Sequence, residues 1–224
     1  IPMRQFAGDL PSHNLSWEIA SKHLKEKKGR FRLLEAGQPS PYLQQIINGS
    51  NLYPRSFWFV RVPANAKVVD HYRPILETDP AIEKQAKPPW KGLVIKGAVE
   101  SSFLYATLLS NNLLPFGILS FSLIVLPLKN QVMLSQTDAV RQSHRDLAEW
   151  LRRAQSLWKK YRKSEVDLLH YVDWQGKITR QRTRGGYRVI CNKSGTYIAA
   201  CVMSVPEDSN WEVDQLPVQG FVAD

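Results

Sequence analysis

The sequence has few cysteines and no long uninterrupted hydrophobic run. Cys191 and Cys201 both fall in apolar stretches, and no spacing typical of metal ligands surrounds them. We therefore expect two small buried side chains and a reducing, cytoplasmic compartment. The most apolar run, residues 113–128, is broken by two prolines and a glycine, so it does not suit a membrane span. No metal site and no membrane partner are expected.

Recognisable catalytic motifs are also absent from the sequence. It contains no dinucleotide-binding glycine fingerprint, no P-loop and no HExxH or GxSxG pattern. Its five histidines are scattered without the spacing of metal ligands. We therefore assign no catalytic, cofactor-binding or metal-binding residue to this segment.

One weak group of acidic residues keeps a metal-dependent nuclease as an alternative. Asp70, Glu77 and Asp79 precede the strand-like segment Val94-Ile95-Lys96. Carboxylates beside a strand lysine bind metal and cleave phosphodiesters in restriction-type nucleases. However, Val94 stands where that pattern has Glu or Gln, and the spacing is loose.

Positive charge is abundant and concentrated. The 30 Lys and Arg residues exceed the 20 Asp and Glu residues, which gives a net charge of +10 and a pI near 9.7. Between Ala139 and Lys193, fourteen basic residues stand against five acidic ones, so this stretch alone carries +9. Such clustering is typical of a phosphate-binding surface, and the alternative is a solubilising face.

The hydrophobic pattern predicts an α+β fold with an antiparallel or mixed sheet. The aromatic stretch Leu52–Val62 and the apolar stretch Phe121–Leu126 predict two strands. Tyr187–Asn192 and Tyr197–Val205 flank a glycine-containing loop and predict a C-terminal β-hairpin. We divide the chain into an N-terminal helical lead-in, residues 1–40, and an α+β domain that spans residues 41–224.

One long basic helix is predicted from about residue 139 to residue 163, after the capping sequence Gln136-Thr137-Asp138. Basic side chains occupy most of its surface. Apolar residues recur at helical spacing and form one stripe: Val140, Leu147, Leu151, Ala154, Leu157, Trp158 and Tyr161. A protein–protein docking domain that uses this stripe is therefore an alternative function.

The segment from Lys177 to Gly186 is the best binding candidate. Arg180, Arg182 and Arg184 alternate, so in an extended conformation they would share one face while Gln181 points the other way. Arginine can fork onto guanine or phosphate, and glutamine can bind adenine through two hydrogen bonds. A solvated loop is the alternative.

Cations beside aromatic residues and on the long helix extend this candidate set, because such pairs suit stacking and phosphate contact. The complete set of DNA-binding candidates is Arg55, Lys91, Arg152, Lys159, Lys177, Arg180, Gln181, Arg182 and Arg184.

A series of motifs in a fixed order resembles a known family. The series is Pro41-Tyr42-Leu43, Tyr53–Val60, Ala86–Gly92, Gly97–Tyr105, Leu114-Pro115-Phe116, Trp158, Leu168, Tyr171–Gln181 and Val189–Thr196. It resembles the region downstream of the catalytic domain in large bacterial N6-adenine DNA methyltransferases of the restriction–modification or phage-defence type. In that family the region is taken to recognise the DNA target.

The resemblance implies a target-recognition module whose partner is double-stranded DNA. It also implies that the parent chain carries a catalytic methyltransferase domain that uses S-adenosylmethionine. This segment contains neither an Asn-Pro-Pro-Tyr-type tetrapeptide nor a glycine-rich cofactor loop. Methyl transfer is therefore not assigned to it, and whether it is part of an enzyme depends on the parent protein.

Overall fold

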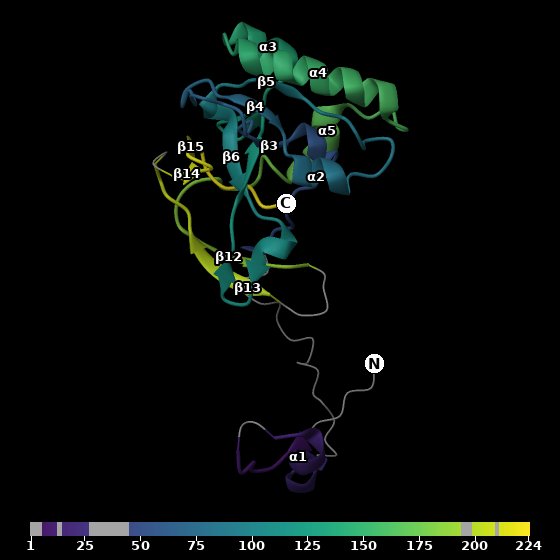
Figure 1. Ribbon diagram of the computed structural model, residues 1–224, viewed down its shortest axis with the longest axis vertical. Coiled ribbons are helices and arrows are strands. Elements are labelled where there is room, and N and C mark those ends of the chain that lie inside the picture. Colours follow the sequence, from purple (N-terminus) through teal and green to yellow (C-terminus); the bar gives the residue numbers. More distant parts are fainter. Residues whose placement is uncertain (1–5, 13–14, 27–44, 194–198, 209–210) are drawn as a thin grey trace. The chain divides into compact units, whose positions relative to one another are not determined.

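The computed structural model describes residues 6–12, 15–26, 45–193, 199–208 and 211–224. The chain forms two compact units, residues 1–46 and residues 47–224 (Figure 1).

The first unit contains one short helix and a two-stranded ladder. Helix α1 (Trp17–His23) follows the N-cap residue Ser16 and ends at Leu24, which is already extended. Strand β1 (Phe6–Ala7) pairs antiparallel with β2 (Lys25–Glu26). The expected helical lead-in thus includes a helix of 7 residues, and residues 27–44 lie outside the described part.

A five-stranded sheet forms the centre of the second unit, in the order β5-β4-β3-β9-β6, with every neighbouring pair antiparallel. The strands are β3 (Phe59–Arg61), β4 (Ile75–Thr78), β5 (Lys96–Ala98), β6 (Leu104–Thr107) and β9 (Ser122–Val125). Strands β6 and β9 are buried on both faces, which explains their continuous apolar sequences. The strand expected over 52–62 is shorter, because a 3-10 turn, η2 (Arg55–Phe57), precedes β3.

The long basic helix expected over 139–163 is found in part, as two helices. Helix α3 (Gln136–Arg141) starts at a capping box between Ser135 and Asp138, one residue before the expected capping sequence. The backbone then turns at Ser143, whose φ is 65°. This left-handed residue ends the first helix, and α4 (Arg145–Tyr161) follows in a new direction.

The apolar stripe of α4 belongs to the core of this chain. Four of its residues are at most 4% exposed: Leu147, Leu151, Ala154 and Trp158. Trp150, which the predicted stripe omitted, is also buried and donates its indole N–H to the carbonyl of Phe57 at 3.0 Å. The stripe therefore faces the core of its own domain. It is not exposed for a partner, so the docking alternative that relied on it loses its support.

Short helices and two-stranded ladders complete the second unit. The helices are α2 (Pro80–Gln85), α5 (Leu168–Val172), η3 (Ser101–Phe103), η4 (Ser110–Asn112) and η5 (Trp174–Gly176). The ladders pair β7 (Leu113–Leu114) with β8 (Gly117–Ile118), β10 (Leu128–Lys129) with β11 (Val132–Met133), and β14 (Glu212–Val213) with β15 (Leu216–Pro217). Among the helices described, none is long and apolar enough to cross a membrane.

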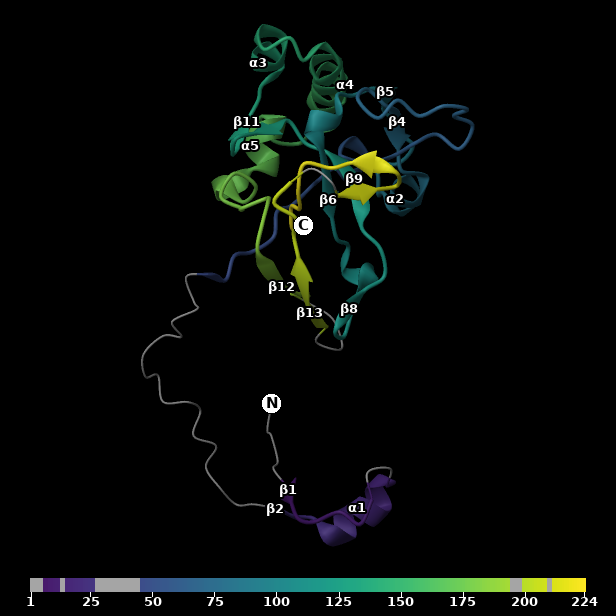
Figure 2. The same ribbon diagram turned by 90° about the vertical axis from the view of Figure 1, so that its left-hand side faces the viewer.

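The expected C-terminal hairpin is found in part. Strand β12 (Tyr187–Cys191) pairs antiparallel with β13 (Ala200–Ser204), while residues 194–198 of its loop lie outside the described part. Figures 1 and 2 show this hairpin beside β8, at the opposite end of the second unit from α4.

The C-terminal segment lies along the outer edge of β6. Phe221 forms a parallel bridge with Ala106, and the N–H groups of Ala106 and Val222 extend the ladder. The N–H of Phe221 also donates to the carbonyl of Thr183 at 2.8 Å. The candidate loop at 177–186 is therefore held against the edge of the sheet by this segment.

Candidate nucleic-acid interface

The candidate loop begins as a turn and not as an extended strand. The Asp173 carboxylate accepts hydrogen bonds from the N–H groups of Ile178 and Thr179 and from the Thr179 hydroxyl, at 2.7–3.0 Å. These bonds fold residues 177–180 into a turn. The expected alternation of side chains along an extended strand therefore does not apply to Arg180.

Gln181 is part of the fold and not of the surface. Its side chain is 5% exposed. Its Nε2 donates to the carbonyls of Lys177 at 2.7 Å and Ala223 at 3.1 Å, and its Oε1 accepts from the N–H of Ala223 at 2.8 Å. An amide engaged in this way cannot read an adenine, so Gln181 is not retained as a DNA contact.

Backbone carbonyls hold three guanidinium groups of the segment where the loop enters β12. Arg182 Nε donates to the carbonyl of Arg184 at 3.0 Å, and Arg188 Nη2 donates to the carbonyl of Arg182 at 2.6 Å. Arg184 Nε donates to the carbonyl of Gln219 at 2.7 Å. We call Arg182, Arg184 and Arg188 the arginine cluster. Backbone carbonyls carry no net charge, so these bonds fix the guanidinium groups without neutralising them.

One exposed carboxylate pairs with the arginine cluster in the described part of the chain. Arg182 lies 3.3 Å from Glu207, and both side chains are largely exposed, at 67% and 78%. An ion pair this exposed is screened by water and contributes little. The cluster therefore keeps most of its positive charge.

Arg188 was not among the candidates chosen from the sequence, because it falls within a predicted strand and outside the loop. Burial lowers the pKa of Arg188, and the nearby charge of Arg182 lowers it further. Both causes disfavour a positive charge at this place. An anion bound here would offset the repulsion, so the cluster is suited to a phosphate.

Two glycines shape the turn that leads from the loop into β12. Gly185 and Gly186 have φ values of 67° and 73°, in the left-handed region that favours glycine. A Cβ at Gly185 would collide with the Glu207 carboxylate. The absence of a side chain at Gly185 thus lets the Glu207 carboxylate approach the backbone of the loop.

A second basic surface surrounds the C-terminal end of α4. The ring of Trp90 stacks on Trp158 at 5.4 Å and meets Tyr161 edge-on at 6.3 Å. These contacts place the exposed Lys91, the neighbour of Trp90, beside the last turns of the helix. Lys159 is exposed on the same turns, so the structure brings these two predicted residues to one region.

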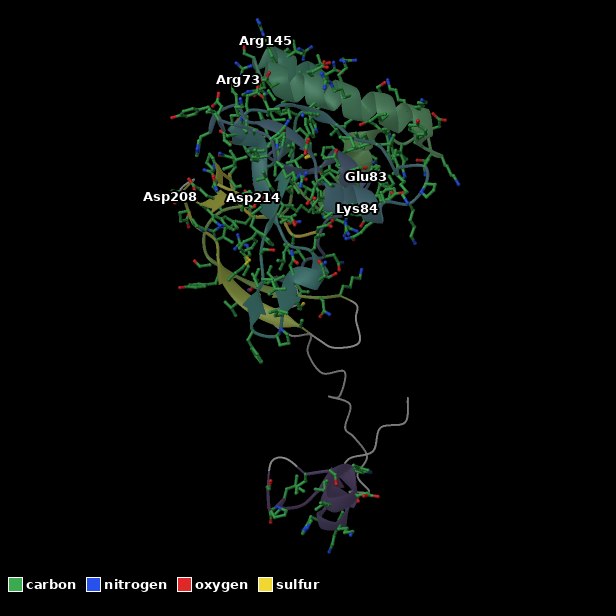
Figure 3. All side chains as sticks on the ribbon, viewed as in Figure 1. Arg73, Glu83, Lys84, Arg145, Asp208 and Asp214 are labelled. Atoms are coloured by element: carbon green, nitrogen blue, oxygen red, sulfur yellow. The ribbon has the colours of Figure 1, made fainter. Side chains whose placement is uncertain are left out.

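The charge of Arg152 is offset within its own helix. The Glu149 carboxylate lies 2.7 Å from both Arg152 and Arg153, and these two hydrogen bonds lower the pKa of Glu149 to about 2. At the start of the helix, Arg73 pairs with Asp146 at 2.7 Å, while Arg145 points outward (Figure 3). The N-terminal half of α4 is therefore less positive than its composition suggests.

Arg55 is used to fix the end of the described chain. Its Nη2 lies 2.9 Å from the Asp224 carboxylate, whose side chain is 5% exposed. The same carboxylate accepts the N–H of Leu52 at 2.8 Å. Lys177 is half-buried, and its carbonyl accepts the Gln181 amide. The side chain of Arg55 is thus engaged in holding the C-terminal segment, whereas Lys177 holds the loop only through its backbone carbonyl.

The predicted residues do not form one continuous site. Lys91, Arg152 and Lys159 lie around α4, whereas Arg182 and Arg184 lie at the start of the β12–β13 hairpin. These two elements occupy opposite ends of the second unit (Figures 1 and 2). The sequence analysis grouped all of these residues in one set of DNA-binding candidates. Their separation in space could not be seen from the sequence.

The acidic residues of the nuclease alternative make separate contacts, although Glu77 lies beside Lys96 on the neighbouring strand. Glu77 pairs with Arg61 at 3.3 Å and with Lys96 at 3.8 Å, Asp70 accepts backbone N–H groups, and Asp79 caps α2. Within the described residues, no three His, Cys, Asp or Glu side chains gather where they could hold a metal ion. The nuclease alternative therefore loses its support.

Comparison of the chain with protein-family models, with curated proteins and with solved structures found no match. The interpretation of the site therefore depends on its geometry and charge.

Proposed function

We propose that this chain binds double-stranded DNA as a target-recognition module. The observation that carries the proposal is the arginine cluster, in which three guanidinium groups are fixed by backbone carbonyls and paired with one exposed carboxylate in the described part. Phosphate oxygens accept the parallel N–H groups of arginine and supply the missing negative charge. The clustered charge of +9 between residues 139 and 193 supports the same proposal.

The exposed arginines would have distinct roles in such a complex. Arg182 and Arg184 would contact phosphates, because the fold fixes both side chains beside the sheet edge. Arg180 is exposed, lies over Gly176 and has no ion pair within the described residues, so it is free to reach a base edge. Lys91 and Lys159 would provide a second phosphate-binding surface at the other end of the unit.

The order of motifs supports a more specific function within the same proposal. The module would belong to an N6-adenine DNA methyltransferase of the restriction–modification or phage-defence type. A catalytic domain of the same parent chain would bind S-adenosylmethionine and transfer the methyl group. The module would hold the duplex while that domain extracts the target adenine from the base stack.

The experiment is a fluorescence anisotropy titration of a labelled mixed-sequence duplex with the 224-residue chain. We expect the double variant Arg180→Gln/Arg182→Gln to bind roughly thirtyfold more weakly, because each of the two lost phosphate or base contacts is worth about 1 kcal/mol. Arg73→Gln is the matched control, since Arg73 is exposed but paired with Asp146 beside α4. Equal affinities of the double variant and the wild type would contradict the proposal.

A further inference from the structure

An exposed aromatic residue stands at the tip of the β7–β8 hairpin. Pro115 and Phe116 form the two-residue connection between these strands. The Phe116 side chain is 96% exposed, and its φ of 65° lies in the left-handed region. A turn with positive φ at its second position favours glycine or asparagine, so a bulky aromatic residue is costly here. Burial of the ring does not compensate this cost, because Phe116 is almost fully exposed.

The tip is fixed in place although its ring is exposed. The N–H of Phe116 donates to the carbonyl of Ala200 in β13 at 2.8 Å. Pro115 restricts the preceding backbone, and both β7 and β8 contact β13. On either side of the ring, Leu114 and Leu119 are also exposed. The structure thus holds an apolar projection on a rigid support.

Cations stand on β12 and just after it, one strand beyond the β13 strand that contacts this tip. Ala200 pairs with Cys191, and Arg188 lies three residues before Cys191, a distance of roughly 10 Å along a strand. Lys193 follows Cys191 by two residues in the other direction. No charged residue occurs between Ser101 and Leu128, so the tip itself is neutral. A neutral ring with cations further along the supporting hairpin suits a base whose neighbouring phosphates lie along the same strand.

We propose that Phe116 is a wedge that stacks on a base or enters a base step of the bound duplex, with Arg188 and Lys193 against the flanking phosphates. This inference rests on the proposed DNA binding and adds a contact that distorts the duplex. Apolar side chains that enter base steps partly unstack and kink DNA. Stacking on an aromatic ring is tolerant of sequence, because every base presents a π face. The wedge would therefore assist distortion of the duplex and not select its sequence.

The test uses the full chain and duplexes that carry 2-aminopurine at successive positions. Unstacking of 2-aminopurine raises its fluorescence, so we expect a rise at one or two positions when the wild type binds. Phe116→Ala should lose this rise and bind roughly tenfold more weakly, with an unchanged salt dependence, because no charge is removed. Phe116→Trp should restore the signal. Val140→Ala is the control, since Val140 is an exposed apolar residue on α3.

Three results would count against the wedge, and they are distinguishable. If the wild type binds DNA but Phe116→Ala keeps both the signal and the affinity, the wedge is overturned and the proposed function stands. If the wild type does not bind DNA at low salt, both proposals fall. The exposed Val189 and Val202 lie on the β12–β13 hairpin, which contacts the tip through β13, and they could take part in a protein contact. If sedimentation shows self-association that Phe116→Ala abolishes while DNA affinity is unchanged, the tip is a protein contact and the wedge is overturned.

Discussion

The side-chain amide of Gln181 binds the backbone of Ala223 through both of its polar atoms. Its Oε1 accepts the N–H of Ala223 at 2.8 Å, and its Nε2 donates to the carbonyl of Ala223 at 3.1 Å. Ala223 is 42 positions away from Gln181 in the sequence, and its N–H and carbonyl are both bonded by the one amide, as a neighbouring strand would bond them. Together with the bonds from Phe221 to Thr183 and from Arg184 to Gln219, this pairing attaches the arginine-rich loop to the C-terminal segment.

Replacement of Gln181 should therefore lower stability. Gln181→Ala leaves the partly buried N–H of Ala223 and the carbonyl of Lys177 without their partner, while the carbonyl of Ala223 keeps its bonds from Ser50, so we expect the free energy of unfolding to fall by about 2 kcal/mol. Urea unfolding followed by tryptophan fluorescence measures this change. Gln85→Ala, at an exposed position at the end of α2, should change little. A loss of less than about 0.5 kcal/mol at Gln181 would show that water replaces the amide.

Replacement of Phe116 by glycine should raise stability. Glycine adopts the left-handed conformation without strain, while it also loosens the unfolded chain, so we expect a net gain of about 0.5–1 kcal/mol. The same urea unfolding experiment measures it, with Phe116→Ala as the reference that keeps a Cβ. A destabilised Phe116→Gly variant would show that the exposed ring contributes to folding, and the argument from strain would fail.

Stability should decrease at mildly acidic pH because of His144. Burial lowers the pKa of His144 below its ordinary value of 6.5, and the charge of Lys129, whose Nζ lies 3.1 Å from His144 Nε2, lowers it further. As pH falls, the unfolded chain takes up the proton first. The contribution of His144 is therefore complete above about pH 6.5 and is lost as pH falls through the lower pKa of the folded state.

His144→Gln should flatten this dependence, since glutamine does not titrate. Urea unfolding at about pH 7.5 and about pH 5.5 provides the comparison. If wild type and variant lose the same stability between these two conditions, another group causes the change.

Removal of Glu149 should strengthen DNA binding if α4 contributes the second surface. Two arginines hold its pKa at about 2, so the carboxylate is charged at neutral pH and offsets them. Glu149→Gln should raise affinity by about threefold at low salt and less at high salt, because screening reduces exposed charges. Anisotropy titrations at two salt concentrations test this. An unchanged affinity would confine DNA to the hairpin end of the unit.

The sequence predicted the elements of this fold better than their contacts. Apolar continuity over residues 121–126 predicted β9, and two apolar stretches that flank a glycine-containing loop predicted the β12–β13 hairpin. The break in the long helix was not predicted, because Ser143 in a left-handed conformation leaves no periodic signal. Its consequence is that Val140 is exposed on α3 and does not join the buried stripe of α4.

The candidate site was harder to predict because the sequence does not show which polar groups the fold itself uses. Gln181 and Arg55 read as contacts for DNA, yet both bind the C-terminal segment, about 40 and 170 residues away. Arg188 read as one residue of a strand, although it completes the arginine cluster. Pairing over such distances depends on the packed sheet and cannot be inferred from local spacing.

The most direct test of DNA binding by the arginine cluster is the dependence of duplex affinity on salt concentration. A protein that neutralises three phosphates shows a slope of log K against log salt of about −2.7, and loss of one contact reduces its magnitude by about 1. We predict a slope of about −3 or steeper for the wild type and a shallower one, by about 1, for Arg182→Gln. A wild-type slope near zero, or an identical slope for the variant, would contradict the account.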